Sequence, residues 1–150
     1  MKKIFIISAI VIAVLGLGAL LFIQGERSQP AQGDAISETG IHWHADLAIY
    51  IKGQKQTVPK DIGIGIVHKP FHTHDGTGQL HLEFGGKVTK EDIKLKKFFE
   101  NWNKTFSNNC IFEHCNGSEG KVKFLVNGKE NSEFENHEVQ DGEKLEVRFE

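Results

Sequence analysis

The clearest structural signal in this chain is the segment HWHADLAIYI, residues 42–51. Its odd-numbered positions are all apolar: Trp43, Ala45, Leu47, Ile49 and Ile51. Its even-numbered positions begin with three polar residues: His42, His44 and Asp46. Because side chains of a β-strand alternate between the two faces of a sheet, this pattern predicts a strand with one buried face. The opposite face would present two imidazoles and a carboxylate.

A second stretch, KPFHTHDGTGQLHLEFGG at residues 69–86, predicts a β-hairpin around the turn sequence DGTG. With those four residues as the loop, His72 faces His81 and His74 faces Gln79. The core face then carries Leu80, Leu82 and Phe84. The other face gathers His72, His74, His81 and Glu83. A register that slipped by one residue would turn each of these side chains to the opposite face.

Residues 89–106 predict an amphipathic α-helix. Thr89 and Asp92 fit a capping box that would start this helix. Large apolar residues follow at helical spacing: Leu95, Phe98, Phe99, Trp102 and Phe106. Since a sheet needs a cover for its apolar face, we interpret this stripe as core packing and not as a cofactor site.

Two further strands are predicted near the C-terminus. Apolar residues alternate with polar ones at Val122, Phe124 and Val126, and again at Leu145, Val147 and Phe149. The turn sequences Asn127-Gly128 and Asp141-Gly142 lie between the two runs. Strands, one helix and more strands in this order indicate an α+β domain over residues 41–150, with a mixed β-sheet and one amphipathic helix packed on one face.

The N-terminal region predicts a single membrane span. Residues 4–23 are an uninterrupted run of apolar and small residues, long enough to cross a bilayer as a helix. Lys2 and Lys3 precede the run and no convincing cleavage site follows it, so we expect residues 1–24 to be an uncleaved anchor with a cytoplasmic N-terminus. Residues 25–40 are expected to be a flexible linker. The domain at 41–150 would then be extracytoplasmic, on a single-pass protein of the cell membrane.

Histidine is the unusual part of the composition. Six of the eight histidines fall between His42 and His81. Of the 18 Lys and Arg residues, two precede the apolar run, so 16 basic side chains remain against 20 acidic ones. This negative balance argues against nucleic acid as a partner.

The paired histidines predict a site for a divalent transition metal. Residues i and i+2 of a strand point the same way with Cα atoms about 6.5–7 Å apart, so two imidazoles can converge on one ion. The predicted ligands are His42, His44, His72, His74, His81 and Glu83, with Asp46 and Asp75 behind them. Histidine with carboxylate suits Cu(II) or Zn(II) best, and Fe(II) or Ni(II) next. The alternative is that these histidines bond backbone groups or face solvent.

The remaining histidines and the two cysteines carry weaker signals. His68 precedes the hairpin, and its direction is open. His137 lies in an acidic segment and is expected to be a surface residue. Cys110 and Cys115 are expected to form a disulfide in an oxidising compartment, and the alternative is a small metal or redox site with His114.

Several segments in succession carry a resemblance: HWHADLAIYIKGQ, FHTHDGTGQLHLE, LKKFFENWN, CIFEHCNG and VKFLVNGKE. Together they resemble an uncharacterised family of microbial membrane-anchored proteins with a histidine-rich outer domain. The resemblance covers nearly all of residues 41–150 and implies an architecture but no activity. VNGKE followed by DGEKLEVRF also looks like the closing strands of β-grasp domains.

These observations favour a metal-binding protein that senses, buffers or delivers copper or zinc at the outer membrane surface, with a metal-donating or metal-receiving membrane protein as partner. A metal-dependent enzyme, with Glu83 or Asp75 as general base, is the second hypothesis. A third makes the domain an interaction module of a membrane assembly. An open coordination position beside a pocket would favour the enzyme.

Overall fold

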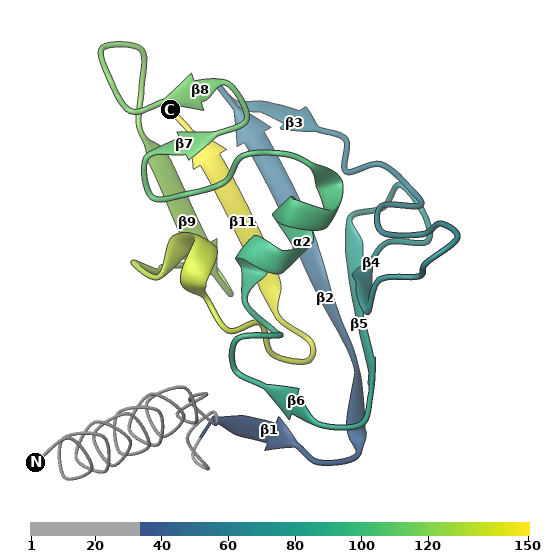
Figure 1. The fold of residues 1–150 in the computed structure, drawn as a ribbon. Helices are drawn as coiled ribbons and strands as arrows, with labels where there is room; N and C mark the ends of the chain where they lie inside the picture. Colours follow the sequence, from purple (N-terminus) through teal and green to yellow (C-terminus); the bar gives the residue numbers. More distant parts are fainter. Residues whose placement is uncertain (1–33) are drawn as a thin grey trace, which may run out of the picture. The chain divides into compact units, whose positions relative to one another are not determined.

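The alternating segment forms strand β2, Gly40–Ile51, in the middle of the main sheet (Figure 1). Ala45, Leu47 and Ile49 on its odd face are at most 3% exposed. His42 and Asp46 lie exposed on the even face. The predicted strand and its buried face are therefore confirmed.

The computed structural model describes residues 34–150. The predicted anchor, residues 1–24, and the first part of the predicted linker lie outside the described residues. No helix within 34–150 is long and apolar enough to cross a bilayer. At the end of the predicted linker, β1, Ala35–Ser37, pairs with β6, Val88–Thr89. The ordered domain thus starts before residue 41.

The main sheet is mixed, as predicted. Six strands follow the order β10-β9-β11-β2-β5-β4, and β3 pairs with the end of β2. Strand β11 runs parallel to β2, whereas the other neighbours are antiparallel. Apart from β2, the strands of this sheet are β3 Gln54–Gln56, β4 Phe71–His72, β5 Gln79–Gly85, β9 Val122–Val126, β10 Lys129–Glu130 and β11 Lys144–Phe149.

The one α-helix, α2, is shorter than predicted and spans Leu95–Trp102 within the described part of the chain. The Thr89 hydroxyl and amide do donate to Asp92 Oδ2, at 2.7 and 2.8 Å, but they close a turn that precedes the helix. The helix starts late because the chain before it pairs with another segment: the Leu95 amide donates to the His137 carbonyl at 2.9 Å. At its other end, Asn103 adopts the left-handed conformation, which stops the helix before Phe106.

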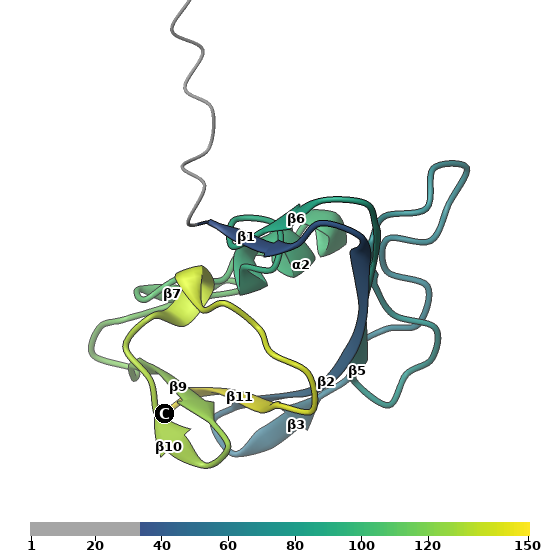
Figure 2. The same ribbon diagram turned by 90° about the horizontal axis from the view of Figure 1, so that it is seen from below.

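Helix α2 and the small sheets β1-β6 and β7-β8 lie over one face of the main sheet (Figure 2). The core between them is rich in phenylalanine. Phe98 of α2 contacts Phe71 of β4, with ring centroids 5.7 Å apart. The other covering elements are β7 Cys110–Ile111, β8 His114–Cys115 and the 3-10 helix η1 Phe134–Asn136.

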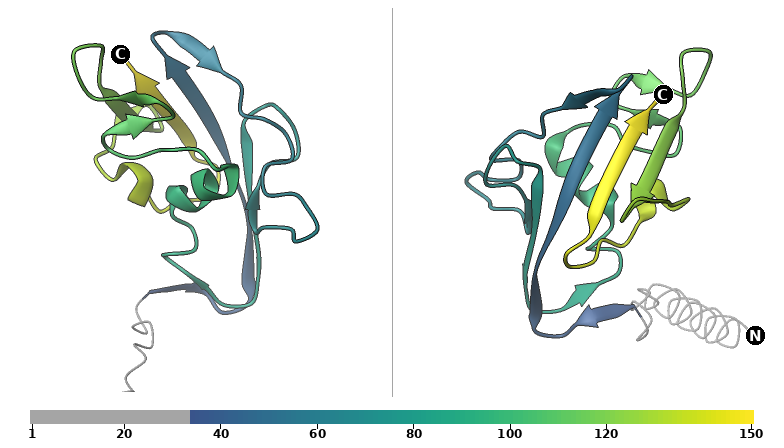
Figure 3. Two further views of the ribbon diagram at one scale, coloured as in Figure 1. Left: turned by 45° about the horizontal axis from the view of Figure 1, so that its top comes forward. Right: turned by 180° about the vertical axis from the view of Figure 1, so that it is seen from behind.

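The opposite face of β2, β11 and β9 carries no covering element among residues 34–150, as the right-hand view of Figure 3 shows. This open face is the one that carries the even-numbered side chains of β2. It therefore places His42 and His44 of β2 in reach of solvent.

Candidate metal centre

Three adjacent strands bring the predicted ligands into neighbouring rows. In the ladder, His81 of β5 lies opposite His44 of β2 on one side and opposite His72 of β4 on the other. The next pair along β2 and β5 is His42 opposite Glu83. The predicted facing of His72 and His81 is confirmed, and the alternation of each strand turns all these side chains to the open face.

His72 is held in an orientation that suits a metal ligand. Its side chain is 1% exposed, and its Nδ1 donates to the Lys69 carbonyl oxygen at 2.9 Å. A carbonyl oxygen can only accept, so Nδ1 carries the proton and the lone pair of Nε2 is free. Hydrogen bonds of this kind fix the tautomer and ring direction of metal-binding histidines.

The free nitrogen of His72 lies 3.1 Å from Nε2 of His74. Two nitrogens bound at about 2.0–2.1 Å to one tetrahedral Zn(II) would be separated by about 3.3 Å. The two imidazoles are thus held near the spacing that a shared ion requires. In the absence of an ion, a proton on His74 can bridge the two nitrogens.

The ladder does not extend to His74, so the predicted pairing of His74 with Gln79 is wrong. Strand β4 has only two residues. The chain is held instead by Thr73, which is 0% exposed and donates its hydroxyl to the Pro59 carbonyl at 2.9 Å. The Ile62 amide donates to the same hydroxyl at 3.1 Å. Thr73 therefore fixes both neighbouring histidines through the 59–62 loop.

Glycine allows the loop after His74 to reach β2. Gly78 has φ +94°, and the Leu47 amide donates to its carbonyl at 2.8 Å. A Cβ at this position would collide with the Leu47 carbonyl oxygen. Only glycine fits this approach, which closes the turn against the sheet.

His81 and Glu83 lie next to the pair formed by His72 and His74. The Nδ1 of His81 is buried without a hydrogen-bond partner, and it lies 3.5 Å from Oε1 of Glu83. The same oxygen lies 4.0 Å from Nε2 of His72. Buried polar atoms rarely lack a partner, and among residues 34–150 no group bonds this nitrogen, which leaves it available to a metal ion.

The environment favours the neutral form of two of the imidazoles, because it lowers their pKa values. Burial lowers the pKa of His72, although its hydrogen bond to the Lys69 carbonyl acts the other way. Burial also lowers the pKa of His81, and the neighbouring histidines His44, His74 and His72 lower it further. Since only neutral imidazole coordinates a metal, both shifts favour ligation.

Two ligand groups result from this geometry. The first contains His72, His74, His81 and Glu83, and the second contains His42, His44 and His81. Within each group, one ligand atom from every residue lies within 4.8 Å of those of the others. The structure thus brings all six predicted ligands together, and His81 belongs to both groups.

The backbone of His44 has a support that the sequence pattern did not indicate. The His44 amide donates to Asp141 Oδ1 at 2.9 Å, and the Gly142 amide donates to the His44 carbonyl at 2.7 Å. The turn predicted at 141–142 therefore holds β2 at His44, although Asp141 and His44 are 97 residues apart in sequence.

Other candidate residues lie outside both groups. The ring of His68 lies 4.4 Å from that of His72, so this residue approaches the centre without joining it. Asp75 accepts two hydrogen bonds from Thr77, which lower its pKa and hold one of its oxygens in the turn. Asp46 faces a groove beyond the histidines.

The prediction for His137 is wrong. This residue is 6% exposed, and its two ring nitrogens contact Glu133 and Glu143 at 2.8 and 2.9 Å. Its backbone carbonyl also accepts a hydrogen bond from the Leu95 amide, which holds His137 against the start of α2 and buries it. The acidic residues near His137 thus bond its imidazole and hold it in the interior.

Cys110 and Cys115 form the predicted disulfide. Their pairing removes both thiols as metal ligands. His114 contacts Phe149, with ring centroids 5.2 Å apart, and belongs to neither ligand group. The alternative of a Cys-His metal site is therefore not supported.

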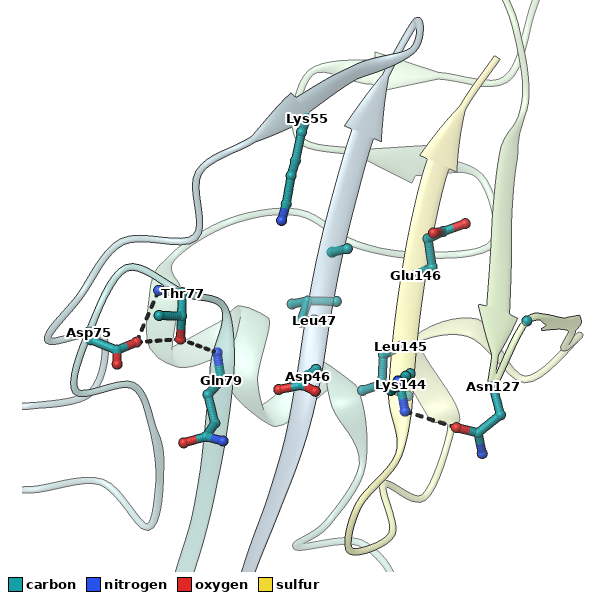
Figure 4. A pocket seen from close by; sticks show the side chains of 12 residues that line it. Asp46, Leu47, Lys55, Asp75, Thr77, Gln79, Asn127, Lys144, Leu145 and Glu146 are labelled. Carbon is teal, nitrogen blue, oxygen red and sulfur yellow. Dashed lines mark hydrogen bonds between the residues drawn. The ribbon is translucent and has the colours of Figure 1, made fainter.

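A groove of about 910 Å³ lies on the same open face, with Asp46, Lys55 and Gln79 among its lining residues (Figure 4). Asp46 and Gln79, which pair across β2 and β5, stand directly beyond the His44–His81 pair. On the far side, Lys144 and Glu146 of β11 line the groove. A ligand in this groove would lie next to the second metal-ligand group.

Comparison of the chain with known proteins finds no matching family model, no similar curated protein and no similar solved structure.

Proposed function

We propose that this chain is a membrane-anchored extracytoplasmic protein that binds a divalent transition metal. One observation carries the proposal: the ligand atoms of His72, His74, His81 and Glu83 lie within 4.8 Å of one another. Three nitrogens and one oxygen form a complete donor set for a four-coordinate ion. The hydrogen bond from His72 to Lys69 orients the most buried of these ligands in advance.

Cu(II) and Zn(II) are the metals that this donor set fits best. The ligands are imidazole nitrogen and carboxylate oxygen, which both metals accept. Soft ligands are absent from the described groups, because the two cysteines are bonded to each other. Met1 is the sole methionine of the sequence. Cu(I), which prefers thiolate and thioether, is therefore disfavoured.

We infer a role in sensing, buffering or delivering the metal. Three of the ligands, His42, His74 and Glu83, are exposed on the open face. Exposed ligands can exchange an ion with ligands of another protein. The expected partner is a metal-donating or metal-receiving membrane protein that docks on this face.

The proposed location rests on the sequence. Residues 4–23 have the length and composition of a membrane span, and Lys2 and Lys3 favour a cytoplasmic N-terminus. The Cys110–Cys115 disulfide suits an oxidising compartment outside the cytoplasm. The metal centre would work close to the outer membrane surface.

We also propose a β-grasp-like fold for the domain. The order β5-β2-β11-β9, with parallel β2 and β11 in the centre and α2 between the two strand pairs in sequence, supports it. We further propose that the chain belongs to the histidine-rich family that it resembles, and only the sequence motifs support this.

A metal-dependent enzyme is the second candidate, and the groove beside the histidines favours it. A substrate lying along Asp46 and Lys144 would adjoin an ion on the second ligand group. Glu83 could then act as general base, since its oxygen lies within 3.5 Å of His42 and His81. Asp75 is less suited, because Thr77 already bonds it.

The test is metal titration of the full chain, purified in detergent and stripped with chelator. We expect stoichiometric, tight binding of Zn(II) and Cu(II) by isothermal titration calorimetry. The double variant His72→Ala/His74→Ala should lose more than the roughly 10- to 100-fold in affinity that follows loss of a ligand's hydrogen-bond partner.

His114→Ala is the matched control, because it removes a histidine outside both ligand groups. Its affinity should equal that of the wild type. Equal affinity of the double variant and the wild type would refute the site. Chelation without any effect on thermal stability, together with no detectable binding, would favour the interaction module.

A further inference from the structure

We propose that the two ligand groups form one two-ion centre in which His81 is the shared ligand. This inference rests on the proposed metal binding and extends it from one ion to two. Its starting point is that His81 belongs to both groups, one with His72, His74 and Glu83, the other with His42 and His44. A site for a single ion needs three or four ligands, whereas six converge here.

The strand order places the two groups on opposite sides of His81. Strand β5 lies between β2 and β4, so His81 has His44 on one flank and His72 on the other. Its ring is nearly perpendicular to that of His44, with centroids 4.7 Å apart. Its ring is nearly parallel to that of His72, with centroids 5.4 Å apart. Each flank thus has its own histidine pair.

One imidazole can serve two ions because its two nitrogens lie on different edges of the ring. Nδ1 of His81 is buried without a hydrogen-bond partner and lies on the side of Glu83, 3.5 Å from its oxygen. When the first ion is bound, the other nitrogen keeps the ring proton. The second ion takes the place of that proton, which leaves to solvent, and each nitrogen then holds one ion.

Glu83 offsets the repulsion between two dications. Its Oε1 lies 3.5 Å from Nε2 of His42 in one group and 3.5 Å from Nδ1 of His81. A carboxylate in this position is attracted to both ions, and the deprotonated His81 ring adds a second negative charge between them. The Glu83 carboxylate and the shared His81 ring therefore favour binding of both ions.

The two sites differ in access. The second group includes His42, whose side chain is 66% exposed, whereas the first contains His72, which is 1% exposed. The ion on His42 and His44 is therefore the more exchangeable one. The ion on His72 and His74 would remain in place while the outer ion is donated or received.

The experiment is a Cu(II) titration of the metal-free full chain in detergent, followed by elemental analysis and electron paramagnetic resonance. We expect two ions per chain. The signal should grow with the first equivalent and lose intensity per copper with the second, because two Cu(II) ions on one imidazole ring couple magnetically. His42→Ala/His44→Ala should bind one ion with a full signal.

His81→Ala separates a shared ligand from two independent sites. It should lose the second ion and weaken the first at least tenfold, while His114→Ala binds as the wild type does. Circular dichroism before titration shows that each variant is folded. One ion per wild-type chain would overturn the two-ion centre and leave the proposed function standing. Two uncoupled ions, or two ions in His81→Ala, would also overturn it, and no binding would refute both.

Discussion

Nε2 of His72 lies 3.1 Å from Nε2 of His74, while the opposite nitrogen of His72 donates to the Lys69 carbonyl. The backbone bond selects the tautomer that leaves a lone pair facing the second imidazole. The local structure thus spaces and orients two nitrogens before any ion arrives. Affinity is gained when ligands do not have to be ordered on binding.

The stability of the metal-free protein should fall as pH drops below about 6.5. His72 and His81 have pKa values below 6.5 in the folded protein, mainly because of burial. Between the folded and unfolded pKa values the unfolded chain binds more protons, so acid favours unfolding. Urea unfolding at pH 7.5 and pH 5.5 measures the loss. His72→Gln/His81→Gln should lose less between these pH values, and an unchanged loss would contradict the assignment.

Thr73→Val should destabilise the domain by about 1–3 kcal/mol, because it removes the buried hydroxyl that bonds Pro59 and Ile62. It should also weaken metal binding, since Thr73 fixes the histidines on both sides of it. Thr57→Val is the control, because this threonine is exposed and lies close in sequence to the 59–62 loop. Urea unfolding and calorimetric titration would show the contrast, and equal effects of the two variants would count against it.

His137→Ala should lower the free energy of unfolding by about 1–3 kcal/mol without changing metal affinity. The substitution removes the histidine partner of Glu143, whose side chain is 13% exposed, and leaves only the Gln140 amide bonded to this carboxylate. His68→Ala, at an exposed position, should change stability by about 0.5 kcal/mol or less. A drop in metal affinity for His137→Ala would mean that this residue has a role in the centre.

Reduction of the disulfide should cost stability and leave metal binding unchanged. Cys110 and Cys115 are separated by five positions, and so short a closed loop predicts about 2 kcal/mol. Urea unfolding and metal titration of Cys110→Ser/Cys115→Ser measure both effects, and this variant needs no reductant, which could bind the metal. A change in metal stoichiometry in this variant would revive a sulfur-containing site.

Much of the sheet was predictable because its signal is local. The alternation from Trp43 to Ile51 fixes which face of β2 is buried, and the DGTG loop fixes the register that puts His72 opposite His81. Periodicity and turn chemistry act within a few residues, so the sequence displays them directly. The mixed sheet with one helix followed from the same signals.

The errors arose where distant segments meet. The Thr89 amide donates to Asp92 Oδ2, which is one of the two bonds of a capping box, yet α2 starts only at Leu95 because the Leu95 amide donates to the His137 carbonyl. The same pairing buries His137, which an acidic local sequence had placed on the surface. Asp141 supports His44 from 97 residues away. No local pattern records such contacts.

The most direct test of the metal centre is X-ray absorption spectroscopy of the full chain loaded with one equivalent of Zn(II). We predict a first shell of nitrogen and oxygen at about 2.0–2.1 Å, with imidazole scattering from three histidines and no sulfur. In the His42→Ala/His44→Ala background, where the second ligand group cannot hold the ion, adding His72→Ala/His74→Ala should remove two of those imidazoles. A shell with sulfur, or a shell that the double substitution leaves unchanged, would contradict the assignment of the ion to His72, His74, His81 and Glu83.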